Sequence, residues 1–240
     1  MDWRILHNPV TESTNKDAFG GKPGDVFTAG LQTAGRGRLD HKWLSPPGEN
    51  LMMSAVVDVS DMPLQEIVTL PLVAGLSVAE AVNGIFVSCG KDSLCSGVKV
   101  KWPNDVLVAG LKICGILCER NGDNVIIGIG LNVNQTVFPP EIDKRATSVR
   151  LETGAETGVD KVRDSVLSVL GENVGQWRKF GFRPLLPRLA ELDCLRGNFV
   201  SVRRTDDDAE PVSGMCGGIR PDGTLDVAGT GIPAGEAHVI

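Results

Sequence analysis

Short apolar runs, separated by turns rich in Gly, Pro, Asn and Asp, dominate the first half of the chain and predict strands. Residues 3–10 alternate weakly between apolar and polar positions, which predicts an edge strand. Residues 26–32 and 51–59 are nearly continuous apolar runs of the length typical of strands buried on both faces. The segment between these two runs is therefore expected to be a loop that connects two core strands.

Apolar positions at helical spacing predict four helices. Residues 14–19 predict a short one, and the pattern over 62–84 predicts a longer one. We expect the regular part of this longer helix to begin one or two residues before Pro71, because proline is tolerated only in a first turn. Residues 159–180 predict a long amphipathic helix, and residues 184–195 predict one more.

The middle of the chain predicts an antiparallel meander. Residues 98–108 have strand propensity on both sides of Pro103, which indicates two short strands joined by a tight turn. Residues 111–119 and 125–131 flank Asn121-Gly122, a strong hairpin signal.

Strict alternation along 111–119 predicts which side chains share a face of the sheet. It assigns Lys112, Cys114, Ile116 and Cys118 to one face and Gly115 to the other. The cysteines are expected to be buried thiols. Two interpretations of Lys112 stay open: its ammonium extends to solvent at the sheet edge, or it enters a site.

After Gly197 the pattern changes to short apolar segments between Asp, Gly and Pro turns, which predicts a small all-β module. We expect residues 1–195 to form a main domain and residues 196–240 to form this module. At this size the module would be only marginally stable if it folded alone. The acidic run Asp206-Asp207-Asp208 is expected to be a solvated hairpin tip.

Composition narrows the class of protein. The chain has 240 residues, 42% hydrophobic residues and a net charge of -6, which argues against a general nucleic-acid scaffold. We expect no membrane span and no signal peptide, and hence a cytoplasmic protein. The six cysteines and three histidines show no metal-ligand spacing, so the cysteines are expected to be reduced and structural.

Candidate chemistry is concentrated in the loop over residues 33–43. Gly35 and Gly37 let the backbone approach a ligand closely, while Arg36 and Arg38 supply forked cations suited to a carboxylate or phosphate. Trp43 offers a flat face for a purine or an apolar cover. The alternative is a solvated basic turn beside a core tryptophan.

Several common catalytic motifs are absent. The sequence contains no Walker-type loop, no G-x-G-x-x-G after a strand, no G-x-S-x-G elbow and no H-E-x-x-H. The commonest nucleotide-binding loops, α/β-hydrolase chemistry and zinc proteolysis are therefore disfavoured.

Five stretches follow one another along the chain: Glu12-Ser13-Thr14-Asn15; Gln32 to Arg38 with Trp43, Ser45-Pro46, Gly48 and Asn50-Leu51; Lys101-Trp102-Pro103-Asn104-Asp105; Lys112 with Gly115-Ile116-Leu117; and Gly128, Gly130 and Asn132. In this order they resemble the biotin protein ligases, over nearly the whole chain. The resemblance implies an α+β fold, a mixed β-sheet flanked by helices like that of class II aminoacyl-tRNA synthetases, with a small C-terminal SH3-like β-barrel.

The family's activity implies the substrates and partners. Its members make biotinyl-5′-adenylate from biotin and ATP with Mg²⁺, then transfer biotin to one lysine of a biotin carboxyl carrier domain of a carboxylase. A homodimer is one assembly that the resemblance allows. Since only twelve residues precede Ser13, we expect a ligase without an N-terminal DNA-binding domain.

The resemblance also implies roles for individual residues. Ser13, Thr14 and Gln32 would bond the urea of biotin. Arg36, Arg38 and Lys112 would meet its carboxylate and the α-phosphate. The full expected biotin set is Ser13, Thr14, Asn15, Gln32, Gly35, Arg36, Gly37, Arg38, Lys112 and Gly115.

For ATP, the resemblance implies that Trp43 packs against adenine. The full expected ATP set is Arg38, Trp43, Lys101, Asn104, Asp105 and Asn132. The expected catalytic residues are Lys112, Arg38 and Asp105. Asp105 is expected either to hold Mg²⁺ or to accept the proton of the incoming lysine, and both roles stay open.

One departure from the family and two rival functions stay open. Leu39-Asp40-His41 follow the arginines where further basic and glycine residues are usual, which puts the phosphate contacts in doubt. The rivals are a lipoate or octanoate ligase of the same fold and a non-catalytic biotin sensor. In the ligase interpretation, the loop over residues 35–41 is a lid that closes over biotin.

Overall fold

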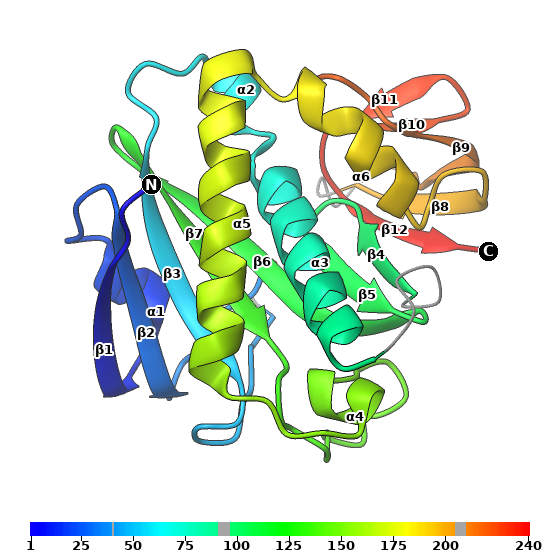
Figure 1. The fold of residues 1–240 in the computed structure, drawn as a ribbon. Helices are drawn as coiled ribbons and strands as arrows, with labels where there is room; N and C mark the ends of the chain where they lie inside the picture. The colour runs from blue at the N-terminus through cyan, green and yellow to red at the C-terminus, as the bar shows by residue number, and fades with distance from the viewer. Residues whose placement is uncertain (40, 91–96, 205–209) are drawn as a thin grey trace.

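The structure, a computed structural model, describes residues 1–39, 41–90, 97–204 and 210–240. Its main element is a seven-stranded mixed sheet with the order β1-β2-β3-β7-β6-β5-β4 (Figure 1). β1 is parallel to β2, and the other neighbours are antiparallel. The strands are β1 Arg4–Thr11, β2 Asp25–Gln32, β3 Leu51–Asp58, β4 Val98–Lys101, β5 Asp105–Val108, β6 Leu111–Asn121 and β7 Asn124–Leu131.

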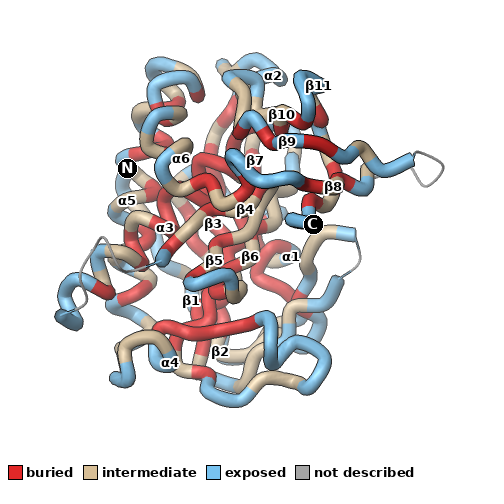
Figure 2. The backbone as a smooth tube through the Cα atoms, turned by 90° about the vertical axis from the view of Figure 1, so that its right-hand side faces the viewer, coloured by how far each residue is buried: buried red, intermediate tan, exposed pale blue. Residues whose placement is uncertain are grey.

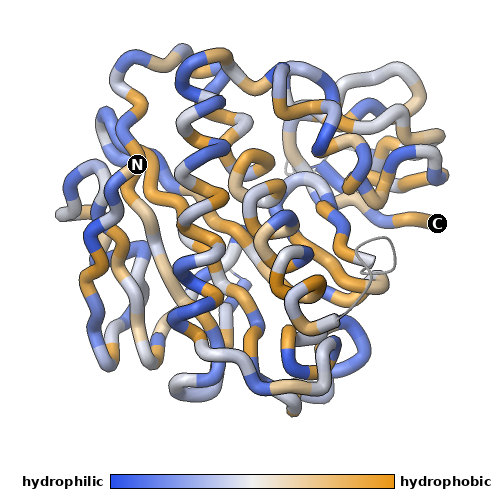
Figure 3. Tube along the Cα trace, viewed as in Figure 1, coloured by the Kyte–Doolittle hydropathy of each residue, from blue (hydrophilic) through white to orange (hydrophobic). Residues whose placement is uncertain are grey.

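Helices cover both faces of this sheet unequally. The long helices α3 (Leu70–Ser88) and α5 (Val159–Phe180) pack against one another on one face, and the short α1 (Thr14–Ala18) lies on the other (Figure 1). Pro71 occupies the first turn of α3, as predicted. Backbone N–H groups in a first turn have no intrahelical acceptor, so the missing N–H of proline costs no hydrogen bond there. The central strands β3 and β7 and helix α3 are largely hydrophobic, whereas the edge strand β1 and helix α5 carry many hydrophilic residues (Figure 3).

Two short helices near α3 and α5 differ from the predictions. α2 (Leu64–Ile67) precedes α3, and α4 (Val149–Thr153) was not predicted. α4 has the usual stop and start signals: the Ser148 hydroxyl accepts from Leu151 N at 3.1 Å, and Gly154 ends the helix with φ 75°. The predicted helix over 184–195 is a 3₁₀ turn, Arg183–Leu185, followed by α6 (Leu186–Leu192).

The C-terminal segment forms a second, five-stranded antiparallel sheet with the order β11-β10-β9-β8-β12, consistent with the expected SH3-like module. Its strands are β8 Phe199–Arg203, β9 Val212–Ile219, β10 Leu225–Val227, β11 Thr230–Ile232 and β12 Glu236–Val239. Its buried residues belong to the same hydrophobic cluster as those of the main sheet (Figure 2). Trp102 also donates to the Gly223 carbonyl at 3.0 Å, which ties the two parts together.

A β-bulge in β6 corrects the predicted alternation. Leu107 pairs with Lys112 and Val106 pairs with Cys114, so Ile113 is an extra residue on β6. Ile113 and Cys114 are both fully buried, and every residue after them is shifted by one position. The prediction that Lys112 and Gly115 face opposite sides was therefore wrong: a Cβ at Gly115 would lie 3.3 Å from Lys112 Nζ.

The cysteines that the structure describes are free thiols, as predicted. Burial raises the pKa of Cys118 to about 12 and raises that of Cys114 further, so both thiols are neutral near pH 7. Cys95, Asp40 and Asp206–Asp208 lie outside the described residues.

One stretch, Leu64–Ser88, is long and apolar enough to cross a membrane by length and composition alone, contrary to the expectation that no such run exists. In the fold, 67% of the 18-residue window in this stretch that meets the criterion is buried inside the protein. Most of it is α3, which packs against α5 and the sheet, so its hydrophobicity is that of a core helix.

Candidate active site

A cleft of about 340 Å³ lies on the α1 side of the large sheet, beneath the loop between β2 and β3. Its walls come from segments far apart in sequence: the start of α1, the loop, the β4–β5 turn, β6, β7 and β12. The cleft brings together thirteen of the predicted site residues: Ser13, Thr14, Asn15, Gln32, Arg36, Gly37, Arg38, Trp43, Lys101, Asn104, Asp105, Lys112 and Gly115.

Two predicted residues do not line the cleft. Asn132 is buried, and its amide donates to the Thr147 carbonyl at 2.9 Å. Gly35 lies at the base of the loop, where a Cβ would be 2.5 Å from the Trp43 carbonyl oxygen. Trp43 N donates to Gly35 O at 3.0 Å, so Gly35 permits the loop to fold back on itself as a narrow hairpin.

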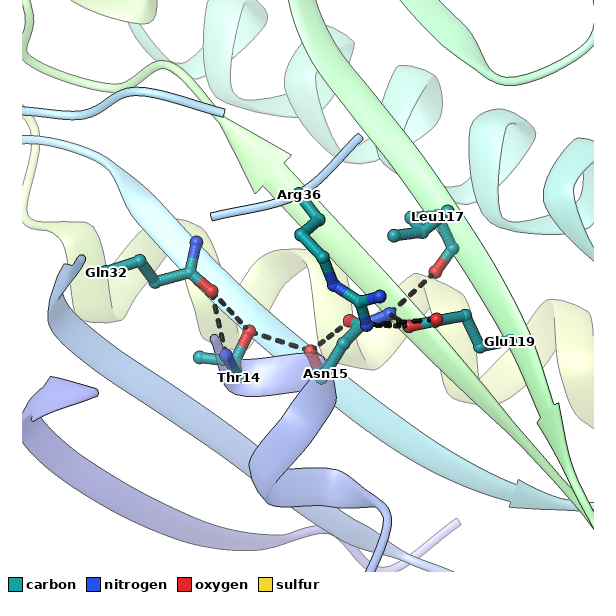
Figure 4. A network of polar contacts seen from close by, with 7 residues as sticks. Thr14, Asn15, Gln32, Arg36, Leu117 and Glu119 are labelled. Atoms are coloured by element: carbon teal, nitrogen blue, oxygen red, sulfur yellow. Dashed lines mark hydrogen bonds and ion pairs between the residues drawn. The ribbon is translucent and has the colours of Figure 1, made fainter. Parts of the chain in front are cut away.

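A polar network built on the buried Thr14, Asn15 and Ser54 lies at one end of the cleft (Figure 4). Gln32 Oε1 accepts from the backbone N of Thr14 at 2.8 Å and from its hydroxyl at 3.1 Å. Ser54 Oγ lies 2.7 Å from Thr14 Oγ1 and donates to Asn15 Oδ1 at 2.6 Å. Asn15 Nδ2 then donates to Glu119 Oε2 at 2.6 Å. These groups hold one another in fixed orientations, as recognition of a neutral polar ligand requires.

The other end of the cleft is charged. Lys112 Nζ lies 2.7 Å from Asp105 Oδ1, and Arg38 Nη1 donates to Asn104 Oδ1 at 3.0 Å. Asn104 is itself fixed, because its Nδ2 donates to the Ile116 carbonyl at 2.8 Å. Burial lowers the pKa of Arg38, while Asp105 and Glu236 oppose that shift. An arginine stays charged at physiological pH even so, and this end presents the cations of Lys112 and Arg38 beside the carboxylates of Asp105 and Glu236.

Glycines on the cleft face of β6 and β7 make room for the side chains above them. A Cβ at Gly128 would lie 2.1 Å from Asn15 Oδ1, and one at Gly130 would lie 2.4 Å from Trp43 Cε2. A Cβ at Gly115 would likewise lie close to the Trp43 ring, 3.2 Å from Cζ3. The G-x-G spacing in β7 thus reflects two close contacts on one face of a strand.

Sequence reasoning missed the residues that the C-terminal module contributes. Glu236, Ala237 and His238 of β12 line the cleft. Glu236 accepts from Arg203 at 3.1 Å and lies 3.5 Å from His41 of the loop. Burial raises the pKa of Glu236, but the hydrogen bond and charge of Arg203, with His41, outweigh it and hold the pKa below its usual value. No local pattern marked these positions, because their role depends on how the module packs.

Arg145 was also missed. It lines the cleft, its carbonyl accepts from Lys112 N at 2.8 Å, and its guanidinium donates to the Glu141 carbonyl at 2.6 Å. The segment that carries it runs beside the start of β6. A lone arginine in an irregular stretch gives no sequence signal of a site.

The family model described as "Biotin/lipoate A/B protein ligase family" matches residues 9–134, which contain most of the cleft. The chain belongs to this family. The matched range runs from β1 to the end of β7, and β12 of the cleft lies beyond it.

Relatives in this ligase family share sequence along much of the chain. The bifunctional ligase/repressor BirA of Bacillus spizizenii is 34% identical over 197 residues, or 77% of this chain. The biotin–[acetyl-CoA-carboxylase] ligase of Paracoccus denitrificans is 31% identical over 187 residues, 73% of this chain and 75% of the relative. The chain spans 58% of the length of the Bacillus relative.

A solved ligase structure has the same fold throughout. The biotin protein ligase of Aquifex aeolicus in complex with biotin and ATP superposes with a TM-score of 0.84 at 28% identity. The likeness covers 98% of this chain and 99% of that one, so it includes both the large sheet and the C-terminal module.

Proposed function

We propose that the chain is a biotin protein ligase, which joins biotin to ATP as biotinyl-5′-adenylate and transfers biotin to a lysine of a carboxyl carrier domain. The observation that carries the proposal is the division of one cleft into two ends of different chemistry. The network around Thr14, Asn15 and Gln32 suits a neutral urea, and the pair Lys112 and Arg38 suits the carboxylate and the α-phosphate. The relatives and the Aquifex structure support the same activity.

Biotin would lie with its urea at the polar network and its carboxylate toward Lys112. At that end, the carboxylate must approach an anionic α-phosphate, and two fixed cations offset the repulsion. Lys112 is already oriented by Asp105 at 2.7 Å, so little reorganisation is needed when charge develops. We propose Lys112 and Arg38 as the groups that stabilise the adenylation transition state.

ATP would bind over the glycine face of β7. The indole of Trp43 lies against Gly130 and Gly115, and its face is available to a purine. Lys101 and Asn104 line the same end of the cleft. Asn132, proposed for ATP from the resemblance, supports this end indirectly, since it bonds Thr147 beside the start of β6.

Mg²⁺ fits this cleft only when the phosphates of ATP supply some of its ligands. Within the described ranges, no group of three or more His, Cys, Asp or Glu side chains is placed to hold a metal ion. Asp105 offers one carboxylate, and Mg²⁺ commonly takes one or two carboxylates together with phosphate oxygens and water. Asp105 is therefore proposed either as one ligand of a phosphate-bound Mg²⁺ or as the group that accepts the proton of the incoming lysine.

The polar network favours biotin over lipoate or octanoate. Neither rival acid has a urea, so binding it would leave the buried Thr14 and Asn15 and the partly buried Gln32 facing an apolar chain. A site built on hydrogen bonds rejects an analogue that lacks them more strongly than an apolar pocket rejects a change of size. A sensor without catalysis would have no need for the Lys112–Asp105 pair.

The remaining parts of the proposal are the partner and the domain division. A carrier domain must present its lysine at the open side of the cleft, near β12. The division into a catalytic part over residues 1–195 and a module over 196–240 belongs to the proposal, as does a homodimer as the assembly.

Thermal shift and pyrophosphate release test this function together. Biotin should raise the melting temperature while lipoate and octanoate do not, and ATP should add stability mainly after biotin. Mixing protein, biotin and MgATP should release pyrophosphate. Stabilisation by lipoate instead would favour the lipoate ligase, and biotin binding without pyrophosphate release would favour the sensor.

A further inference from the structure

An ion pair ties the loop between β2 and β3 to the far end of β6. Arg36 Nη2 lies 3.0 Å from both Oε1 and Oε2 of Glu119, which is 83 residues further along the chain (Figure 4). The side chain of Arg36 is 52% exposed and that of Glu119 is 22% exposed. The pair therefore connects the surface of the loop to a carboxylate on β6 that lies two residues beyond Leu117, which lines the cleft.

Glu119 also belongs to the polar network at the base of the cleft. Its Oε2 accepts from Asn15 Nδ2 at 2.6 Å, and Asn15 is 4% exposed. Asn15 in turn accepts from Ser54, which bonds Thr14. One carboxylate thus joins the loop above the cleft to the residues that would contact the urea below it.

The two arginines of the loop have different partners. Arg38 donates to Asn104, beside Asp105 and Lys112, at the charged end of the cleft. Arg36 is directed to the opposite end, where its charge is already matched by Glu119. The resemblance implied that both arginines contact biotin. Only Arg38 lies at the charged end of the cleft, where an anionic group would bind.

We propose that Arg36 and Glu119 form a latch, a positioning pair that holds the loop closed over the urea end of the cleft and so slows the escape of biotin and its adenylate. This inference rests on the proposed biotin-binding function. Arg36 then acts through the loop and not on the reacting atoms. Because Glu119 also orients Asn15, ligand contact with Asn15 and closure of the loop reinforce one another.

Dissociation rates of labelled biotin, and of labelled adenylate formed on the enzyme, test the latch. The variants are Arg36→Ala, Glu119→Gln and the double variant. Arg178→Ala is the matched control, since it removes an arginine ion pair to Asp58 and Asp61 away from the cleft. Arg36→Ala and Glu119→Gln should each speed dissociation about two- to fivefold, the size expected for a partly exposed pair.

Three further results distinguish a latch from a general structural contact. The double variant should be no faster than the faster single variant, because both remove one interaction. High salt should bring the wild-type rate toward that of Arg36→Ala. Arg36→Lys should restore part of the slow dissociation, while Arg178→Ala should match the wild type.

Several outcomes would overturn the latch. Wild-type dissociation rates for Arg36→Ala, in a protein that binds biotin, would refute it while leaving the proposed function intact. A large loss of the adenylation rate in Arg36→Ala with unchanged dissociation would make Arg36 a substrate contact instead. A wild type that binds no biotin would refute both. Since Arg36 is on an exposed loop, its variants remain informative even if Glu119→Gln fails to fold.

Discussion

Two glycines on one face of β7 determine where the side chains of the cleft can lie. Gly128 lies under Asn15, and Gly130 lies under Trp43. An added methyl group at either position would overlap the atom above it, because the approaches of 2.1 and 2.4 Å are far inside van der Waals contact. The two positions therefore allow the ends of the cleft to be perturbed separately.

We predict that Gly128→Ala raises the KM for biotin about tenfold or more and changes the KM for ATP little, because Asn15 must move. Gly130→Ala should do the reverse, because the Trp43 indole must move. Steady-state pyrophosphate release, with one substrate varied at a time, measures both. Gly175→Ala is the control, since a Cβ there meets nothing within 4 Å. Equal effects on both substrates from each variant would contradict the assignment.

Lys112 is the second residue with a specific expectation. Removing its ammonium should slow adenylate formation by a factor of about 10² to 10³, since an oriented cation opposite developing charge contributes that much. Biotin dissociation should change far less, because the polar network lies at the other end of the cleft. Single-turnover pyrophosphate release by Lys112→Ala measures the effect, and a near-normal rate would refute the role.

At the scale of residues, the sequence predicted thirteen members of the cleft, mostly through motifs in which glycine, arginine and lysine have fixed spacing. It did not predict that Lys112 and Gly115 lie on the same face of the sheet. That face depends on the bulge at Ile113, and a bulge comes from pairing with β5, not from the sequence of β6 alone. Alternation therefore failed at the residue where it mattered most.

At the scale of elements, one ion pair reinforces the parallel pair of β1 and β2 at the sheet edge. Arg4 donates from Nε and Nη2 to the two carboxylate oxygens of the buried Asp25, both at 2.8 Å. Asp25 also accepts from Lys22 N at 2.9 Å. The hydrogen bond from Arg4 lowers the pKa of Asp25 below its ordinary value, even though burial opposes this.

A pH dependence of stability follows. Because the pKa of Asp25 is lower in the folded state than in the unfolded chain, its contribution is complete above the unfolded pKa and is lost as pH falls through the folded one. Asp25→Asn should therefore lower the melting temperature at pH 7, and the difference from the wild type should shrink below about pH 4. A difference that stays constant from pH 7 to pH 3 would contradict this account.

Most elements could be predicted from the sequence, and the exceptions have physical causes. Long periodic segments and strong turn signals determine their structure from local sequence alone. Examples are the 22 residues of α5 and the turn at Asn121-Gly122. α4 and β11 were missed because five and three residues carry no periodicity. Sequence also did not indicate that β7 lies between β3 and β6 in the sheet, which depends on contacts distant in the chain.

At the scale of the whole molecule, the C-terminal module is part of the site and of the core. β12 supplies Glu236 to the cleft and brings it beside His41 of the loop. The module's buried residues join the cluster that includes α3 and the large sheet. The change of pattern after Gly197 predicted a module but not this integration, because burial of one sheet against another depends on the assembled fold.

The division of the cleft also explains why one protein would carry out two steps. Adenylation needs cations that bring two anions together, whereas transfer needs an open side at which a carrier lysine can meet the adenylate. In the proposed function, the charged end would provide these cations, Lys112 and Arg38. In the proposed mechanism, Asp105 beside Lys112 either binds a phosphate-bound Mg²⁺ or receives the proton of the attacking carrier lysine.

Transfer of label from biotin to a carrier tests the central claim most directly. The protein would be incubated with labelled biotin, MgATP and a biotin carboxyl carrier domain, and the label located by digestion and mass spectrometry. We predict label on one lysine of the carrier, dependent on ATP, and no label on a carrier in which that lysine is replaced by arginine. An unlabelled carrier, with a wild-type protein that is folded and binds biotin, would contradict the proposed ligase function.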